Sequence, residues 1–154
     1  MKVYLAAMFS KKNELREYAK CLRRLGIVIT SEWLRERHAL KSKEKSISPK
    51  MLQWYAARDK KGIRKCDTFI LVTPTDFDLL KVGRSLGELR RLARAAHELE
   101  CGMADALGKR LIIVGQRMNA FHYLKKYEVY PAWGDLLKKL DAEQGNSARL
   151  KSTA

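Results

Sequence analysis

The chain has 154 residues, 46% of them hydrophobic, and a formal net charge of +15. This length suits one domain with a buried core, and the composition excludes an intrinsically disordered protein. No apolar run approaches the roughly 20 residues of a membrane-spanning helix, and the N-terminus becomes charged too early for a secretory signal, so we expect a cytoplasmic protein without a membrane partner.

Strands and helices alternate along the first half of the chain. An apolar run over residues 3–7 predicts a first strand, and apolar residues at helical spacing over residues 11–25 predict a helix that ends at Gly26. Residues 26–30 predict a second strand, because β-branched side chains dominate them. After a lysine-rich loop over residues 38–48, Ser48 and Pro49 mark a helix start, and this helix is expected to reach about Lys65.

The second half continues the alternation. The pattern predicts strands over residues 68–73, 110–114 and 127–130, a loop over 76–83, and a helix over 85–107 that Gly108 caps. Pro131 is expected to open a last helix that ends at Leu140. We therefore predict a single domain over residues 1–140, followed by a polar tail over residues 141–154.

The predicted strands are continuous apolar runs, which is typical of strands that are buried on both faces. We therefore predict an α/β protein with a doubly wound, five-stranded parallel sheet of flavodoxin-like order 2-1-3-4-5 and helices on both faces. In such sheets, ligands bind beyond the carboxyl ends of the strands, near the point where the strand order reverses.

Several common sites are absent from the sequence. There is no GxGxxG after the first strand, no GxxxxGK[ST] and no HExxH. The three cysteines have no paired spacing, and the three histidines are far apart in sequence. We therefore expect neither a cofactor nor a metal ion.

Positive charge is concentrated over residues 35–65, which contain eleven Lys or Arg residues and only three acidic residues. Such a field attracts phosphate groups, nucleotides or nucleic acid. The alternative is that these charges lie on a solvated surface and contribute only to solubility.

Glu100 is the most informative single residue. Its helical spacing from Ala96 and Met103 places it on the apolar stripe of its helix, whereas Glu98 aligns with polar neighbours. A carboxylate beside a buried stripe is costly unless it is paired or used in chemistry. A structural salt bridge is the alternative for Glu100, and a surface ion pair is the alternative for Asp59.

Two aromatic residues lie at predicted strand ends, Tyr4 and Trp33. Both positions suit stacking against a base, and both equally suit a place in the core.

Several segments together resemble the nucleoside 2-deoxyribosyltransferase family. Residues 100–109 read ECGMADALGK and are similar to that family's E-x-G-x-A-x-A-x-G-K motif. Residues 3–10 look like its opening strand and the loop that faces phosphate or sugar, and residues 57–67, with Asp59, look like its central segment. Residues 30–34 and 119–122 (NAFH) match actinobacterial and phage members. The resemblance spans roughly residues 2–140.

The resemblance implies a homodimer or higher homo-oligomer that cleaves or transfers the sugar of a nucleoside or nucleoside 5′-monophosphate. Glu100 would be the nucleophile, Asp59 would hold or protonate the base, and Tyr4 would orient the Glu100 carboxylate. Asn119 would reach the site of the neighbouring subunit. The expected substrate-binding residues are Ala6, Phe9, Ser10, Trp33, Gly83, Arg84, Asn119 and His122.

The sequence departs from the family before Glu100. The family has a short Gly-rich turn there, but this chain has a helical insertion of about a dozen residues over 85–96. The insertion favours the alternative of a non-catalytic nucleotide-binding or sensing module, and the net charge favours a basic nucleic-acid-binding protein. The sequence does not decide between a hydrolase and a transferase.

Overall fold

The structure is a computed structural model that describes residues 1–35, 48–75 and 95–152. Its five strands are β1 (Lys2–Ala7), β2 (Val28–Ile29), β3 (Thr68–Val72), β4 (Arg110–Val114) and β5 (Tyr127–Tyr130). All neighbouring strands pair in parallel, in the order β2-β1-β3-β4-β5. This confirms the predicted doubly wound sheet.

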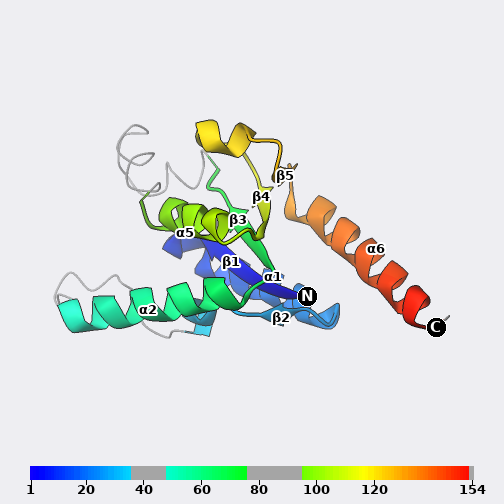
Figure 1. Cartoon of the computed structure of the whole chain (residues 1–154), viewed down its shortest axis with the longest axis horizontal. Coiled ribbons are helices and arrows are strands. Elements are labelled where there is room, and N and C mark those ends of the chain that lie inside the picture. Colours follow the sequence, from blue (N-terminus) through cyan, green and yellow to red (C-terminus); the bar gives the residue numbers. More distant parts are fainter. Residues whose placement is uncertain (36–47, 76–94, 153–154) are drawn as a thin grey trace.

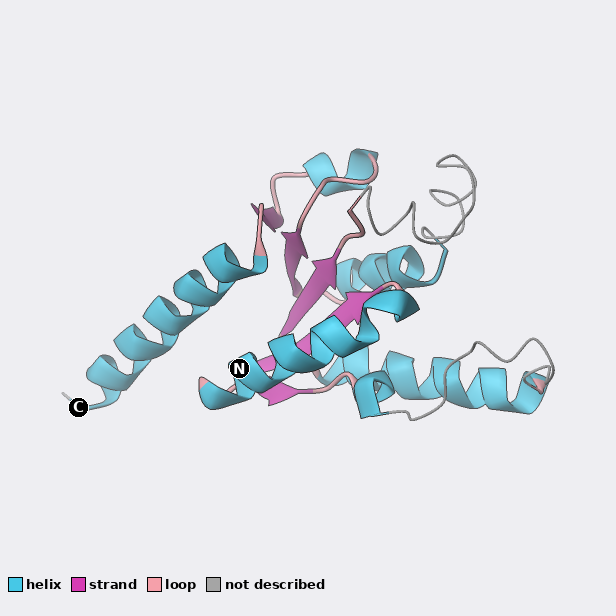
Figure 2. Cartoon of the chain, turned by 180° about the vertical axis from the view of Figure 1, so that it is seen from behind, coloured by secondary structure: helices cyan, strands magenta, loops and turns pink. Residues whose placement is uncertain are grey.

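Helices cover both faces of the sheet (Figures 1 and 2). On one face lie α1 (Lys12–Arg24) and α6 (Trp133–Ser152), which contact each other, and on the other lie α2 (Pro49–Lys65) and α5 (Ala95–Ala106), which also contact each other. Three short 3-10 helices follow strands β1, β2 and β4: η1 (Phe9–Lys11), η2 (Glu32–Arg35) and η3 (Ala120–Tyr123). Among the described residues, no helix combines the length and the apolarity needed to cross a membrane.

The core lies on both sides of the three central strands. Every residue of β3 is buried, as are the apolar residues of β4. This burial is the reason that the strand sequences carry no polar alternation. The largest fully buried side chains come from β1, β3, β4 and the helices on both faces: Tyr4, Leu5, Leu15, Leu22, Ile63, Phe69, Ile70, Leu71, Ile112, Ile113 and Leu136.

Some element boundaries differ from those predicted. Strand β2 is shorter than residues 26–30, because it is an edge strand that pairs with only one neighbour. Helix α6 begins at Trp133, and it runs past Leu140 to Ser152. The added segment has no proline, seven of its twelve residues are good helix formers, and Glu143 within it is held by Arg110 of β4. The predicted loops over 38–47 and 76–83 and residues 85–94 of the predicted helix lie outside the described residues.

Gly62 allows α2 to lie close against the sheet. A Cβ atom at this position would lie 2.7 Å from the Thr30 carbonyl oxygen and 2.9 Å from the ring of Tyr4. Both distances are too short for any side chain. The absence of a side chain therefore brings the C-terminal part of α2, with Asp59 about one turn before Gly62, up to β1.

We predict that Gly62→Ala destabilises the protein by about 1–3 kcal/mol, because α2 must move away from the rigid backbone of residue 30 and from a packed ring. Urea unfolding measures this change. The matched control is Gly145→Ala in α6, where a Cβ would meet nothing within 4 Å. There the substitution should stabilise the helix by about 0.5–1 kcal/mol. Equal effects at both glycines would contradict the close approach.

Candidate active site

A hydrogen bond joins the central sheet to α5 at Glu100. The Tyr4 hydroxyl, from β1, donates to Glu100 Oε1 over 2.9 Å. The Tyr4 ring is fully buried and stacks on Phe69 with 5.5 Å between ring centroids. Burial and the nearby carboxylates of Glu100 and Asp59 hold the pKa of Tyr4 well above its usual range. Tyr4 therefore stays protonated and acts as a fixed donor.

The Glu100 carboxyl group is half-buried and carries an unusual proton affinity. Burial raises its pKa to about 7, and the negative charge of Asp59 adds to the rise. The hydrogen bond from Tyr4 and the positive charge of Arg58 act in the opposite direction. Removal from water is the larger effect, so this group changes charge near neutral pH.

Arg58 and Asp59 face the same region from α2. Arg58 donates through Nη2 and Nε to Asp59 Oδ1, over 2.8 Å and 3.0 Å. The guanidinium group also lies 5.2 Å from the ring centroids of both Trp54 and Tyr55. The sequence left open that Asp59 only forms a surface ion pair. The structure does pair Asp59 with Arg58, but this pair is mostly buried, and its two charges act on Glu100.

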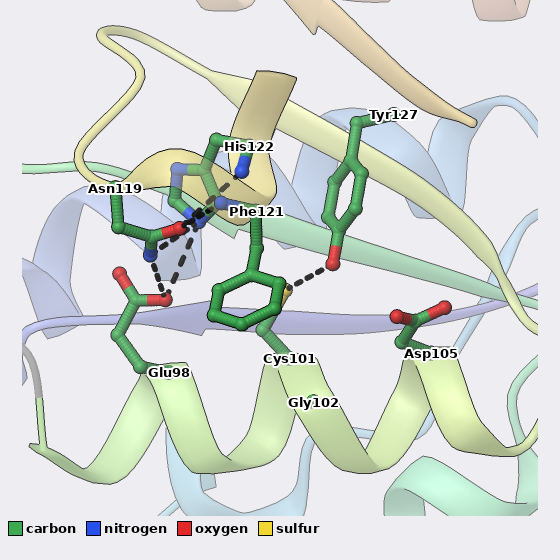
Figure 3. A pocket seen from close by; sticks show the side chains of 8 residues that line it. All are labelled: Glu98, Cys101, Gly102, Asp105, Asn119, Phe121, His122 and Tyr127. Atoms are coloured by element: carbon green, nitrogen blue, oxygen red, sulfur yellow. Dashed lines mark hydrogen bonds and ion pairs between the residues drawn. The ribbon is translucent and has the colours of Figure 1, made fainter. Parts of the chain in front are cut away.

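A second group of polar residues lies on another side of α5, around Glu98. Asn119 Nδ2 donates to Glu98 Oε2 over 2.7 Å, and His122 Nε2 lies 3.3 Å from the same oxygen (Figure 3). The sequence aligned Glu98 with polar residues of its helix, and its neighbours here are polar, but the side chain is largely buried, with only 20% of it exposed. The spacing argument considered only contacts with the sheet, whereas η3 packs over a second side of α5.

The structure therefore separates the predicted site residues into two places. Tyr4, Asp59 and Glu100 come together between β1, α2 and α5, whereas Asn119 and His122 lie beside Glu98. Two residues turn an α-helix by about 200°, so Glu98 and Glu100 point to different sides of α5. Asn119 also caps η3 within its own chain, where its Oδ1 accepts from the backbone N–H groups of Phe121 and His122.

Most other predicted substrate-binding residues lie at or near the carboxyl end of β1. Ala6 is buried within β1, and Phe9 and Ser10 follow in η1. Trp33 is buried in η2, where its indole N–H donates to the Leu5 carbonyl oxygen over 2.9 Å. Their contact with a substrate stays a prediction. The remaining two, Gly83 and Arg84, lie outside the described residues.

Sequence reasoning missed Arg58 and Glu98 as residues of these two places, and it gave no role to Lys12, which lies beside Phe9. The ammonium group of Lys12 is buried 4.8 Å from the ring centroid of Phe9. Only the position of Lys12 soon after the first strand, five residues beyond Ala7, could have indicated this. Glu98 had a usable signal, since its spacing from Cys101 and Asp105 is also helical. Within the described ranges, no group of three or more His, Cys, Asp or Glu side chains could hold a metal ion.

Comparisons with known proteins show the fold. No family model and no curated protein sequence matches the chain. A 2-deoxyribosyltransferase from Bacillus psychrosaccharolyticus superposes with a TM-score of 0.61 at 17% identity, covering 89% of this chain and 90% of that one. The CMP N-glycosidase BcmB from Clostridium botulinum superposes with a TM-score of 0.50 at 22% identity, covering 92% and 99%. The chain thus shares the α/β fold of these enzymes.

The raised pKa of Glu100 predicts how stability depends on pH. Between the ordinary pKa of about 4.5 and about 7, the folded protein binds a proton that the unfolded chain has lost. Stability contributed by this group is therefore present at low pH and is lost as the pH rises through 7. We expect Glu100→Gln to unfold like the wild type near pH 4.5 and to be more stable by roughly 1–3 kcal/mol at pH 8.

Urea unfolding across this pH range measures the difference. Glu128→Gln is the control of opposite sign, because the hydrogen bonds from Arg110 hold the pKa of Glu128 below its ordinary value. That variant should lose stability at neutral pH. If Glu100→Gln instead lost stability as the pH rose, Glu100 would not be a costly buried charge.

Proposed function

We propose that this protein cleaves or transfers the sugar at the N-glycosidic bond of a nucleoside or nucleoside 5′-monophosphate, with Glu100 as the nucleophile. The observation that carries the proposal is that a hydrogen bond fixes the orientation of the Glu100 carboxylate. Tyr4 binds one of its oxygens, and no hydrogen bond among the described residues engages the other, Oε2. An oriented carboxylate with one oxygen available is what attack on an anomeric carbon requires.

The fold adds support without deciding the activity, because one fold can host many reactions. Two proteins that share it are a 2-deoxyribosyltransferase and a CMP N-glycosidase. Both act at the bond between a sugar and a base. In this chain, the E-x-G-x-A motif places Glu100 on α5, beside the sheet and α2.

The proposed reaction has two steps. As the bond between C1′ and the base nitrogen breaks, positive charge develops on the sugar, and Glu100 Oε2 forms a bond to C1′. The base departs with the bonding electrons and takes up a proton, which Asp59 delivers or guides while it holds the base. Water or a second base then attacks C1′, the attacking molecule gives up a proton to the Asp59 carboxylate or to solvent, and Glu100 leaves as a carboxylate. Water gives hydrolysis, and a second base gives transfer.

Positive charge supports the 5′-monophosphate as part of the substrate class. Lys12 is buried just beyond β1, in a chain of net charge +15, whereas its neighbour Lys11 is paired with Glu14 over 2.9 Å. Cations near the carboxyl edge of a parallel sheet favour phosphate there. The homo-oligomer that the family resemblance implies stays a prediction, which sedimentation of the full chain would test.

The first test of the function is release of free base. We expect the protein to release base from at least one member of a panel of nucleosides and their 5′-monophosphates, measured by chromatography with and without an added second base. Glu100→Ala should lower the rate roughly a thousandfold or more, because the covalent step is lost.

Glu14→Ala is the matched control for that variant. Glu14 also accepts a hydrogen bond from a tyrosine, Tyr18, but this pair lies on α1 on the other face of the sheet. Its loss should leave the rate unchanged. Nucleotide binding without base release from any substrate would overturn the proposal in favour of a non-catalytic nucleotide-binding module.

A second prediction concerns the pH profile. Glu100 must be ionised to attack, so kcat/KM should rise with pH through about 7. Tyr4→Phe removes a hydrogen bond that lowers the pKa of Glu100, so the profile should move to higher pH. A rise of one pKa unit would lower the rate at acidic pH about tenfold. Tyr18→Phe should not move the profile, and an unmoved profile in Tyr4→Phe would exclude the positioning role of Tyr4.

A further inference from the structure

The outer face of α2 carries a dense group of positive charges. Five exposed cations lie along this helix: Lys50, Lys60, Lys61, Arg64 and Lys65. The helix has a single acidic residue, Asp59, which is held by Arg58 and faces Glu100. No ion pair joins any of the five exposed cations to a carboxylate in the described part of the chain. Their charge is therefore not compensated within the fold.

Helical spacing gathers several of these side chains on one stripe. The series i, i+4, i+7, i+11 and i+14 keeps to one side of a helix, and in α2 it reads Lys50, Trp54, Ala57, Lys61 and Arg64. The buried residues of α2 lie on the opposite side, so the stripe faces away from the sheet. At 1.5 Å per residue it is roughly 21 Å long, which exceeds the size of a mononucleotide and suits a short polymer.

Trp54 presents an exposed ring whose orientation is fixed by its neighbours. The Tyr55 ring meets the indole edge-on, with 5.4 Å between ring centroids, and the Arg58 guanidinium group lies 5.2 Å from the indole centroid. Even so, 60% of Trp54 is exposed. A ring that is already held in place loses little conformational entropy when a flat partner stacks on it.

Packing within the fold does not account for this ring. The beginning of α2 extends beyond the sheet and beyond α5 (Figures 1 and 2), and every residue from Lys50 to Trp54 is exposed. Tryptophan is enriched in the surfaces that proteins use for binding. Trp54 and the cations around it therefore form a surface that is suited to a partner.

The chemistry of this surface favours single-stranded nucleic acid. A line of uncompensated cations attracts a chain of phosphates, and an exposed aromatic ring stacks on unpaired bases. A lipid surface fits less well, because a helix that lies on a membrane needs a continuous apolar face. The only other large apolar residues exposed on α2, Met51 and Leu52, lie in its first turn.

We propose that the outer face of α2 binds single-stranded nucleic acid, with one base stacked on Trp54 and the phosphates of adjoining nucleotides bound by Lys50, Lys61 and Arg64. This surface is distinct from the site at Glu100, which faces the inner side of α2. Binding here requires no chemistry at Glu100, so the inference does not rest on the proposed function.

A fluorescent deoxythymidine strand of about 12 nucleotides is the probe, a length within the usual range of single-strand sites. The full chain is titrated against it and followed by fluorescence anisotropy. We expect a Kd of roughly 1–100 μM, and a plot of log affinity against log salt with a slope of about −2, as three bound phosphates imply. A Kd above about 1 mM, or an affinity that does not depend on salt, would overturn the proposal.

Trp54→Ala tests the stacked base. An abasic strand of the same length keeps the phosphates and lacks the bases, so it should bind the wild type about tenfold more weakly. The variant should weaken binding of the deoxythymidine strand about tenfold and leave binding of the abasic strand unchanged. The matched control is Tyr123→Ala, because Tyr123 is 69% exposed and has Arg117 5.0 Å from its ring centroid. Equal losses in the two variants would contradict the role of Trp54.

The double variant Lys61→Gln with Arg64→Gln tests the charge, and it keeps the proposal falsifiable if Trp54→Ala does not fold. It should weaken binding of both strands and reduce the steepness of the salt dependence by about 1.4, which is 0.7 for each lost phosphate contact. Arg23→Gln with Arg24→Gln removes the same charge from exposed residues of α1, on the other face of the sheet. If that control had the same effect, net charge alone would explain the binding and the surface on α2 would be excluded.

Two further measurements separate the alternatives. Vesicles of phosphatidylcholine and phosphatidylserine that bind the protein, while the deoxythymidine strand does not, would assign α2 to a membrane and overturn the proposal. Glu100→Gln should lose base release and keep its affinity for the strand, so the proposed function and this surface can each fail alone. A loss of strand binding in Glu100→Gln would place the strand in the Glu100 site and not on the outer face of α2.

Discussion

The hydrogen bond from the Tyr4 hydroxyl to the Glu100 carboxylate ties α5 to strand β1 of the sheet. Its position depends on close packing on both sides of the Tyr4 ring. Phe69 stacks against that ring, and Gly62 lets α2 approach the ring and the backbone beside it. Because α2 lies so close, the charges of its middle turns act on Glu100, and a carboxyl group removed from water there titrates near neutral pH.

Two carboxylates, two residues apart on α5, have opposite properties. Burial is the largest influence on both, but Glu98 receives hydrogen bonds from Asn119 and His122, whereas Glu100 receives one from Tyr4 and faces a second negative charge. The pKa of Glu98 therefore falls and that of Glu100 rises. Environments that drive the pKa values of neighbouring acids apart are typical of sites where acids have different tasks. The two sides of one helix thus carry two carboxyl groups of opposite proton affinity.

The doubly wound sheet explains where both places lie. Parallel strands end at a common edge, and the chain there must pass into loops and short helices, which supply polar groups. The proposed catalytic group lies where β1, α2 and α5 meet. The second place, around Glu98, lies where the β4–β5 connection forms a single turn instead of a full covering helix. The fold is shared with enzymes that act on sugar–base bonds, but the roles proposed for this chain rest on its own residues.

The sequence alone determined the parallel sheet and its strand order, because burial on both faces leaves uninterrupted apolar strands in a regular alternation with helices. Helical spacing also placed Glu100 beside the apolar stripe of its helix. Only the family resemblance pointed to Tyr4 as a partner of Glu100, and the residue pattern by itself did not identify the partners of either acid. Tyr4 and Glu100 are 96 residues apart, and Glu98 and Asn119 are 21 apart. The role of Gly62 was equally hidden, since its neighbours come from β1 and from the end of β2. Only tertiary packing decides such contacts, because the desolvation and hydrogen bonds that tune an acid come from residues that folding, and not chain order, brings together.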